Sequence, residues 1–213
     1  MSASENGWQP AWVDQNSLEW VTVPGTTVNL QIMKGQPAAI LRAFAADFNA
    51  YVEPLRDTDS ASYTPTNSVS TSNHLNGTAM DLNWDSHAFH VKGTFSAAKM
   101  KTIRELLDFY EDTIFWAGDW NDPIDEMHWQ MGYGSYRNPN TASFITRKIR
   151  SDGYSTFRRG PVLAQHVDDV SPTTGVDVAF IPQSQWDEVY KQLTQRFPSR
   201  SIYRTPGEGL IDN

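Results

Sequence analysis

The chain has 213 residues, with 17 Lys and Arg against 25 Asp and Glu, which gives a formal net charge of -8. This acidic balance argues against a general nucleic-acid-binding protein, because phosphate contacts need a basic surface. Cysteine is absent, which excludes disulfides, thiol nucleophiles and thiolate ligands and leaves histidines and carboxylates as the side chains for a metal site.

Residues 1–34 are predicted to form extended segments and turns, because Trp, Pro, Gly and β-branched residues are mixed there without helical periodicity. The first ten residues lack a basic segment followed by an apolar one, so we expect no secretory signal peptide. No run in the sequence approaches the roughly 20 apolar residues of a membrane span. These features predict a protein that is made in a cytoplasm and has no stable membrane association.

Helical and extended patterns alternate along the next hundred residues. A first helix is predicted from residue 37 to about 52, where large apolar residues recur every three or four positions. A long loop rich in Ser, Thr, Asn and Asp follows at 56–76, and a second helix is expected to begin after the N-cap Ser96 and to end near Asp112. Two strands are predicted at 113–116 and 127–131. The pattern indicates an α+β fold, with a small antiparallel sheet and packed helices.

The composition changes near residue 150, so we expect a first domain at 1–150 with its N-terminal extended segment. Residues 151–198 are predicted to form a small C-terminal extension packed on this domain. Within it, residues 175–181 alternate as a strand and residues 186–197 carry a helical apolar stripe. Residues 199–213 contain Pro, Gly and Ser with little periodicity and are expected to be a linker or tail.

Three side chains could bind a metal ion. His74 and Asp81 lie seven residues apart, and His128 follows later in the chain. Three protein ligands on zinc leave a fourth position open, which distinguishes a catalytic site from a closed structural one. Gly77, between the first two residues, would let the backbone turn tightly so that both converge on one ion. The spacing alone is a weak signal, since two histidines and an aspartate can be picked from most chains of this size.

A pair of motifs strengthens the signal. The string from Ser72 to Asp81 has the form SxHxxGxAxD, and residues 125–129 read DEMHW. Together they resemble the peptidoglycan-cleaving zinc peptidases related to D-alanyl-D-alanine carboxypeptidases and to phage L-alanyl-D-glutamate endolysin peptidases. The resemblance covers roughly residues 37–135, and both halves of the motif occur in the family's order. Residues 87–120 are similar to the phage-type members in particular.

The resemblance implies specific ligands and a general base. It implies that His74, Asp81 and His128 bind Zn2+ in a groove on the sheet. It also implies that the acidic residue three positions before the last histidine, Asp125, is the base. This base would take a proton from the water that attacks the amide carbonyl and return it to the leaving amine.

Glu126 is the alternative base. In a strand, Glu126 and His128 would share a face because they are two residues apart. Asp125 would need a turn just before the strand, and Pro123 favours such a turn. We predict Asp125 as the base and keep Glu126 as the alternative.

Four further polar residues lie in or near these motifs. The hydroxyl of Ser72 is expected to cap or brace the loop that holds His74. Arg56 is a candidate for binding a substrate carboxylate, as a displaced counterpart of the arginine that many relatives carry ahead of the zinc motif. His87 and His90 are expected to be exposed loop histidines without a ligand role.

The function implied by the resemblance is a zinc-dependent peptidase. It would hydrolyse an amide bond in the peptide stem or crosslink of bacterial peptidoglycan, as the catalytic module of a phage endolysin. The expected partners are peptidoglycan and further endolysin modules. The lack of a signal peptide agrees with an enzyme that reaches the cell wall after release from the host cytoplasm. An N-acetylmuramoyl-L-alanine amidase and a non-catalytic cell-wall-binding module are the alternatives.

Overall fold

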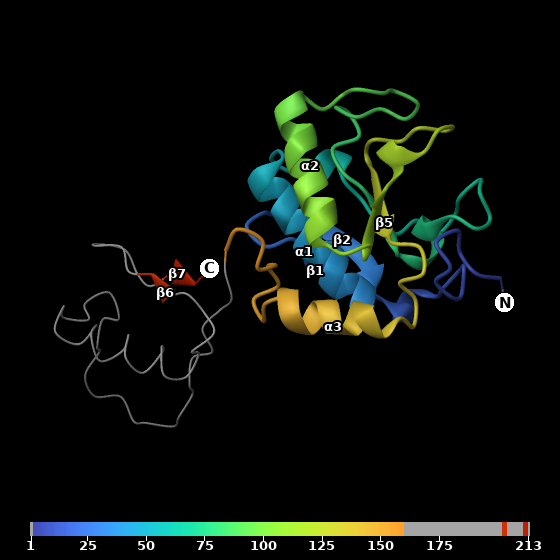
Figure 1. Ribbon diagram of the computed structural model, residues 1–213. Helices are drawn as coiled ribbons and strands as arrows, with labels where there is room; N and C mark the ends of the chain where they lie inside the picture. Colours follow the sequence, from blue (N-terminus) through green and yellow to red (C-terminus); the bar gives the residue numbers. More distant parts are fainter. Residues whose placement is uncertain (1, 160–201, 204–210, 213) are drawn as a thin grey trace. The chain divides into compact units, whose positions relative to one another are not determined.

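A computed structural model of the protein describes residues 2–159, 202–203 and 211–212 (Figure 1). The chain divides into two compact units, Met1–Ala164 and Gln165–Asn213. The described residues of the first unit form three α-helices and five strands and include the candidate functional site. Within the described part of the chain, no helix combines the length and the hydrophobicity that crossing a bilayer requires.

The second unit is described at two short strands. β6 (Ile202–Tyr203) pairs antiparallel with β7 (Ile211–Asp212). The strand predicted at 175–181 and the helical stripe predicted at 186–197 lie outside the described residues.

An antiparallel hairpin follows the N-terminal segment. Its strands are β1 (Leu18–Thr22) and β2 (Asn29–Met33). One turn of 3-10 helix at Gln15–Ser17 precedes it. The prediction of extended segments and turns in this region is confirmed. Leu30 and Ile32 are fully buried, because the alternation of a strand turns every second side chain toward the core.

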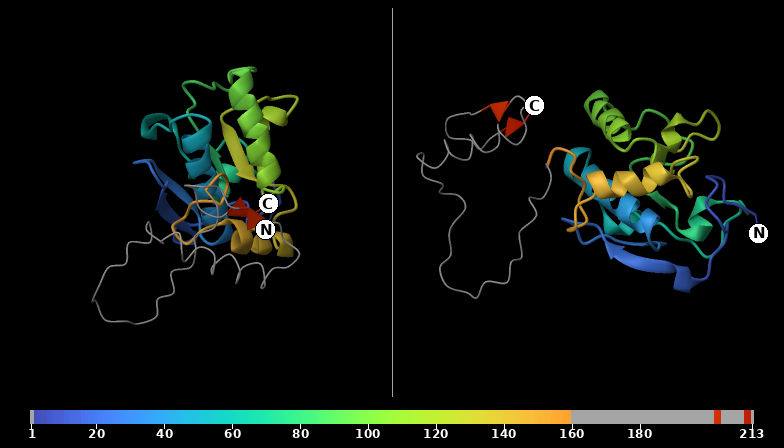
Figure 2. Two further views of the ribbon diagram at one scale, coloured as in Figure 1. Left: turned by 60° about the vertical axis from the view of Figure 1, so that its left-hand side comes forward. Right: turned by 60° about the horizontal axis from the view of Figure 1, so that its bottom comes forward.

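The central helix is α1 (Gln36–Tyr51), in agreement with the helix predicted at 37–52. Pro37 stands in the first turn, where its missing N–H costs no hydrogen bond. Ten of the helix residues are buried, from Pro37 to Phe48, because α1 packs against the hairpin and against other helices and strands of the unit. Figure 2 shows α1 between the hairpin and the helix α2 (Ala97–Phe109).

Helix α2 begins where the sequence predicts. The side chain of Ser96 accepts a hydrogen bond from the backbone N–H of Lys99, as an N-cap does. The helix ends at Phe109, three residues before the predicted end at Asp112. Glu111 and Asp112 both have positive φ angles, so the backbone leaves the right-handed helical region at this point.

Helix α3 (Pro139–Lys148) was not predicted. Its N-cap is Asn138, whose side chain accepts from the backbone N–H of Asn140. Its buried residue Phe144 packs on Tyr110 with a ring-centroid distance of 5.2 Å. Polar residues dominate the rest of the helix, so its sequence has too weak an apolar stripe to be recognised.

A three-stranded antiparallel sheet carries two of the candidate ligands, Asp81 and His128. It has the order β3 (Ala79–Asp81), β5 (His128–Met131), β4 (Ile114–Trp116). The predicted strands at 113–116 and 127–131 are confirmed, and the short β3 was not predicted. The pairing register sets Asp81 directly opposite His128. The α+β prediction is confirmed.

The two faces of this sheet differ in character. Trp129 on the central strand stacks on Trp116 at 5.3 Å and contacts Phe44 of α1 at 4.8 Å. This face therefore belongs to the aromatic core. Because side chains alternate along a strand, His128 and Gln130 project from the opposite face.

Candidate metal centre

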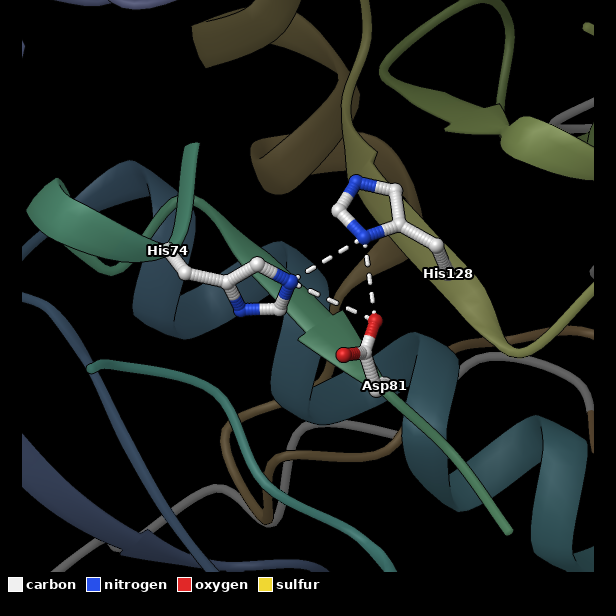
Figure 3. A group of neighbouring side chains, drawn as sticks. All are labelled: His74, Asp81 and His128. Carbon is white, nitrogen blue, oxygen red and sulfur yellow. Dashed lines mark hydrogen bonds and ion pairs between the residues drawn. The ribbon is translucent and has the colours of Figure 1, made fainter. Parts of the chain in front are cut away.

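Three side chains converge on one point above the sheet (Figure 3). His74 comes from the 3-10 turn Asn73–Asn76, Asp81 ends β3 and His128 begins β5. Nε2 of His74 lies 3.1 Å from Nδ1 of His128 and 3.3 Å from Oδ1 of Asp81. The same oxygen lies 3.0 Å from Nδ1 of His128. The structure thus brings together all three ligands that the sequence predicts.

The donor set fits a divalent cation such as zinc. Zinc bonds of about 2.0–2.1 Å in tetrahedral geometry place ligand atoms roughly 3.3 Å apart. The three ligand-atom separations in this group are 3.1, 3.3 and 3.0 Å. Two imidazole nitrogens and one carboxylate oxygen are also a ligand combination that zinc accepts.

The turn that presents His74 is shaped by Ser72 and Gly77. The hydroxyl of Ser72 accepts from the backbone N–H of His74 at 3.3 Å. Gly77 has a φ angle of +68°, in the left-handed region. A Cβ at this position would lie 2.8 Å from both Leu18 Cδ2 and Met33 N. Glycine is therefore required here both by conformation and by space.

Hydrogen bonds fix how the two imidazoles face the centre. Nδ1 of His74 lies 2.6 Å from the carbonyl oxygen of Ser62. Because a carbonyl only accepts, Nδ1 must carry the proton, and Nε2 presents its lone pair to the centre. His128 has the opposite arrangement, with Nε2 2.9 Å from Oε1 of Gln130 and Nδ1 toward the centre.

The ionised state of Asp81 favours cation binding. Burial alone would raise the pKa of Asp81, but the charge of His74 and the hydrogen bond from His128 outweigh it and hold this pKa well below its usual range. Burial alone would lower the pKa of His74, and Asp81 reverses the effect. Asp81 therefore stays ionised, which is the form that coordinates a metal.

A cavity of about 280 Å3 opens onto the three ligands. The ring of Trp120 stacks on His128 with a centroid distance of 5.4 Å and forms one wall. Val69 and Phe89 line the same cavity and remain exposed. The centre is therefore open to solvent on one side and bordered by apolar and aromatic surface.

Asp125 lines this cavity beside the ligands. A turn precedes β5, closed by the bond from the N–H of His128 to the carbonyl of Asp125 at 3.3 Å. Oδ1 of Asp125 is buried, and among the described residues it has no hydrogen-bond partner. Burial, and then the charge of Asp81, raise the pKa of Asp125 to about 6.

Glu126 has the opposite surroundings. Its carboxylate accepts from the backbone N–H of Gly93 at 2.7 Å, from that of Thr94 at 2.8 Å and from the Thr94 hydroxyl. The residue is 3% exposed, and it is not among the described residues that line the cavity. The strand alternation that would align Glu126 with His128 does not apply, because β5 begins at His128.

Arg56 is held away from the centre. Its guanidinium bonds the buried carboxylate of Asp59 and the hydroxyl of Ser86. Among the described residues that line the cavity there is neither an arginine nor a lysine.

The prediction of an exposed loop residue is wrong for His87. This residue is 2% exposed. Its Nδ1 lies 2.6 Å from the hydroxyl of Thr94, its Nε2 lies 2.9 Å from Oε1 of Glu53, and its ring stacks on Phe95 at 3.8 Å. Glu53 lies 34 positions before His87 in the chain, so no local pattern could reveal this contact. His90 is exposed, as predicted.

Sequence reasoning missed two residues near the centre. Gln130 bonds His128, and it could have been found because it lies two residues further along the same strand face. Glu5 lines the cavity. It comes from the N-terminal segment, where no motif marks it.

Comparison with known protein families gives one match. A family model described as D-alanyl-D-alanine carboxypeptidase matches residues 65–131. The predicted family resemblance is confirmed. The matched segment contains His74, Asp81, Asp125 and His128, and the match indicates a peptidase. No curated protein and no solved structure matches the chain.

Proposed function

We propose that the protein is a zinc-dependent peptidase that hydrolyses an amide bond in the peptide stem or crosslink of bacterial peptidoglycan. The family match supports the peptidase class and the peptidoglycan substrate. One structural observation carries the catalytic assignment. The unpartnered oxygen of Asp125 is buried in the same cavity as His74, Asp81 and His128.

The ligand set favours a catalytic metal over a structural one. Nε2 of His74, Oδ1 of Asp81 and Nδ1 of His128 would hold the ion. A structural zinc normally has four protein ligands, whereas three leave a position for reacting groups. When bound, zinc supplies a Lewis acid that polarises the scissile carbonyl and lowers the pKa of water. The set of three protein ligands therefore argues against a module that only binds the cell wall.

Asp125 is the proposed general base. A base is most effective when its pKa lies near the working pH, and burial raises the pKa of Asp125 to about 6. Its carboxylate takes a proton from the water that attacks the amide carbon. The protonated carboxyl then gives this proton to the leaving nitrogen, so the base is regenerated. Glu126 remains the second choice as base, and its saturated hydrogen bonds weigh against it.

The apolar wall supports substrate positioning. Trp120 stacks on His128, and Val69 and Phe89 border the cavity. These side chains can pack on the methyl and methylene groups of a stem peptide while they exclude water from the centre. Arg56 is not part of this wall, so we assign it no role in binding a substrate carboxylate.

We also propose that the protein is the catalytic module of a phage endolysin. The support is the similarity of residues 87–120 to phage-type relatives. On this proposal the enzyme is made in the host cytoplasm and reaches the cell wall after release, where further modules would assist binding.

The test is digestion of purified peptidoglycan by zinc-loaded protein, with and without chelator, followed by mass spectrometry of the released ends. The proposal expects new amino termini within the stem or crosslink, and it expects chelator to suppress them. A freed lactyl group together with N-terminal L-alanine would instead identify an amidase. Wall binding without cleavage, by protein shown to hold zinc, would overturn the enzymatic assignment.

A further inference from the structure

The N-terminal segment lies beside the loop that presents His74. The backbone N–H of Glu5 donates to the carbonyl of Thr71 at 2.8 Å. The N–H of Asn6 donates to Oδ1 of Asn73 at 3.0 Å, and its side-chain amide donates to the hydroxyl of Thr78 at 3.0 Å. These bonds fix Glu5 next to the metal centre, although the family match begins only at residue 65.

The carboxylate of Glu5 gathers three donors. Oε2 accepts from Nδ2 of Asn73 at 2.9 Å and from Nε2 of Gln130 at 3.1 Å. Oε1 accepts from the hydroxyl of Tyr133. An ionised carboxylate has no proton to give, so each partner must turn a donor toward it. Glu5 thereby favours the orientation in which the NH2 group of Gln130 faces it, and Asn73 supports this orientation by donating to the Gln130 oxygen.

The orientation of the Gln130 amide determines which ring nitrogen of His128 carries the proton. Since the NH2 group of Gln130 faces Glu5, its oxygen faces the other way and accepts from Nδ2 of Asn73 at 2.6 Å. The same oxygen lies 2.9 Å from Nε2 of His128. An amide oxygen can only accept, so Nε2 must carry a proton. Nδ1 is then the ring nitrogen that is free to offer a lone pair to a metal.

We propose that Glu5 is a positioning residue that fixes the proton of His128 on Nε2 through the amide of Gln130. The inference rests on the proposed metal centre and adds to it a group from outside the family's matched segment. A Gln130 amide turned by 180° would present its NH2 group to Nε2 of His128. That nitrogen would then have to accept, the proton would move to Nδ1, and the atom facing His74 and Asp81 could no longer bind a metal.

Asp81 contacts the other nitrogen of the same ring. Its Oδ1 lies 3.0 Å from Nδ1 of His128, so a ring proton placed on Nδ1 would bond this carboxylate and close that nitrogen to a metal. The Gln130 oxygen opposes this arrangement because it holds the ring proton on Nε2.

A matched pair of variants tests the proposal. Glu5→Gln and Glu5→Met both remove the charge and have similar length, but only glutamine keeps an oxygen that can accept from Gln130 and Asn73. The hydroxyl of Tyr133 can rotate to accept from the new amide. Asp108→Lys, on an exposed position of α2, serves as a control for a charge change elsewhere.

Two measurements are made on each full-length variant. The first is the zinc dissociation constant, by competition with a chromophoric chelator. We expect Glu5→Met to bind roughly 10-fold more weakly, in the range typical of lost outer hydrogen bonds around a metal ligand, and Glu5→Gln to stay near wild type. The second is the ring 15N spectrum of metal-free protein near pH 8, in which Nε2 of His128 should be protonated in wild type and in Glu5→Gln and lose this preference in Glu5→Met.

Equal weakening in Glu5→Gln and Glu5→Met would assign the effect to charge and overturn the proposal, as would an unchanged Nε2 proton in Glu5→Met. A wild-type protein that binds no zinc would refute the metal centre instead. The 15N comparison does not depend on metal, so it still decides whether Glu5 acts on His128 in that case.

Discussion

The described part of the chain contains two clusters of histidine and carboxylate side chains, and the two differ in how their polar atoms are bonded. In the candidate metal centre, three ligand atoms meet at the wall of a cavity, and Asp125 beside them keeps an oxygen without a partner among the described residues. In the second cluster, here called the closed cluster, every carboxylate oxygen accepts a hydrogen bond from a described residue. It consists of Glu53, His87, Thr94, Lys99 and Glu126.

The comparison shows that residue type alone does not define a site. The closed cluster ties the end of α1 to the start of α2 and to the turn before β5 through Glu53, Lys99 and Glu126. His87 has both ring nitrogens occupied, so neither offers a lone pair toward a cavity. Saturated hydrogen bonds mark a structural cluster, whereas unsaturated ones beside a cavity mark a site prepared for a ligand.

The largest expected effect comes from replacing a histidine of the metal centre, compared with replacing the histidine of the closed cluster. His128→Ala removes one of three proposed ligands, so peptidoglycan cleavage should fall to background and zinc affinity should drop by orders of magnitude. The measurement is wall digestion together with zinc titration, on protein whose fold is checked by circular dichroism.

His87→Ala should give the reverse pattern. It removes one donor to Glu53, which keeps Asn83 and Lys99, and it removes the ring that stacks on Phe95. This costs about 1–3 kcal/mol of stability, while the specific activity of the folded fraction persists. His90→Asn is the neutral control, because His90 is exposed with a positive φ angle that asparagine tolerates. Full cleavage by His128→Ala would refute the metal centre.

The next comparison uses neighbouring carboxylates that belong to different clusters. Asp125→Asn keeps the size of the side chain but removes its basicity, so the turnover rate should fall by about 10²–10⁴ while zinc still binds. Glu126→Gln should leave turnover within a few-fold of wild type. It weakens the bonds to Gly93 and Thr94, so its main effect is a loss of stability of about 1–3 kcal/mol.

Turnover at several pH values and thermal unfolding distinguish these effects. If Glu126→Gln lost turnover while Asp125→Asn kept it, Glu126 would be the base and the cavity argument would be wrong.

Acid stability sharpens the picture of the closed cluster. Burial alone would raise the pKa of Glu53, but hydrogen bonds from His87, Lys99 and Asn83 outweigh it and lower this pKa from 4.5 to about 2. A carboxylate whose pKa is lower in the folded state than in the unfolded state stabilises the fold at pH values above the unfolded-state pKa. This contribution, at most about 3 kcal/mol, is lost as the pH falls from 4.5 to about 2.

Chemical denaturation of wild type and Glu53→Gln across this range measures the contribution. The wild type should lose more stability between pH 4.5 and 2 than the variant, and the difference between the two curves should vanish near pH 2. Parallel curves would show that the pKa of Glu53 is the same in the folded and unfolded states.

The sequence predicted the elements with strong local patterns. The helical stripe of α1, the N-cap Ser96 of α2 and the apolar strand β5 all have signals within a few residues. Strand β3 has three residues, which is too short for a periodic signal, and it exists because β5 offers it a partner. Its pairing places Asp81 opposite His128.

The convergence of the three ligands was predictable from the motif, because the motif is associated with a known site geometry. The spacing of the three residues alone is not. The partners of His87 and the role of Glu5 escaped prediction for a different reason. Glu5 and Gln130 are 125 positions apart and joined by one hydrogen bond, and such a contact leaves no periodic trace in a sequence. Likewise, the saturation of Glu126 by Gly93 and Thr94 depends on how two loops meet.

The smallest expected effect concerns the turn that presents His74. Ser72→Ala removes the hydroxyl that accepts from the N–H of His74, and loss of such a cap costs about 0.5–2 kcal/mol. Zinc affinity should therefore fall by at most about 30-fold, with turnover unchanged at saturating zinc. Ser68→Ala, at an exposed position of the same cavity wall, is the matched control. Isothermal titration with zinc compares the two variants. The contrary result is a loss of turnover in Ser72→Ala that saturating zinc does not restore. That result would mean that the hydroxyl acts on the substrate. The functional site would then include Ser72 itself and not only the ligand His74 that it braces.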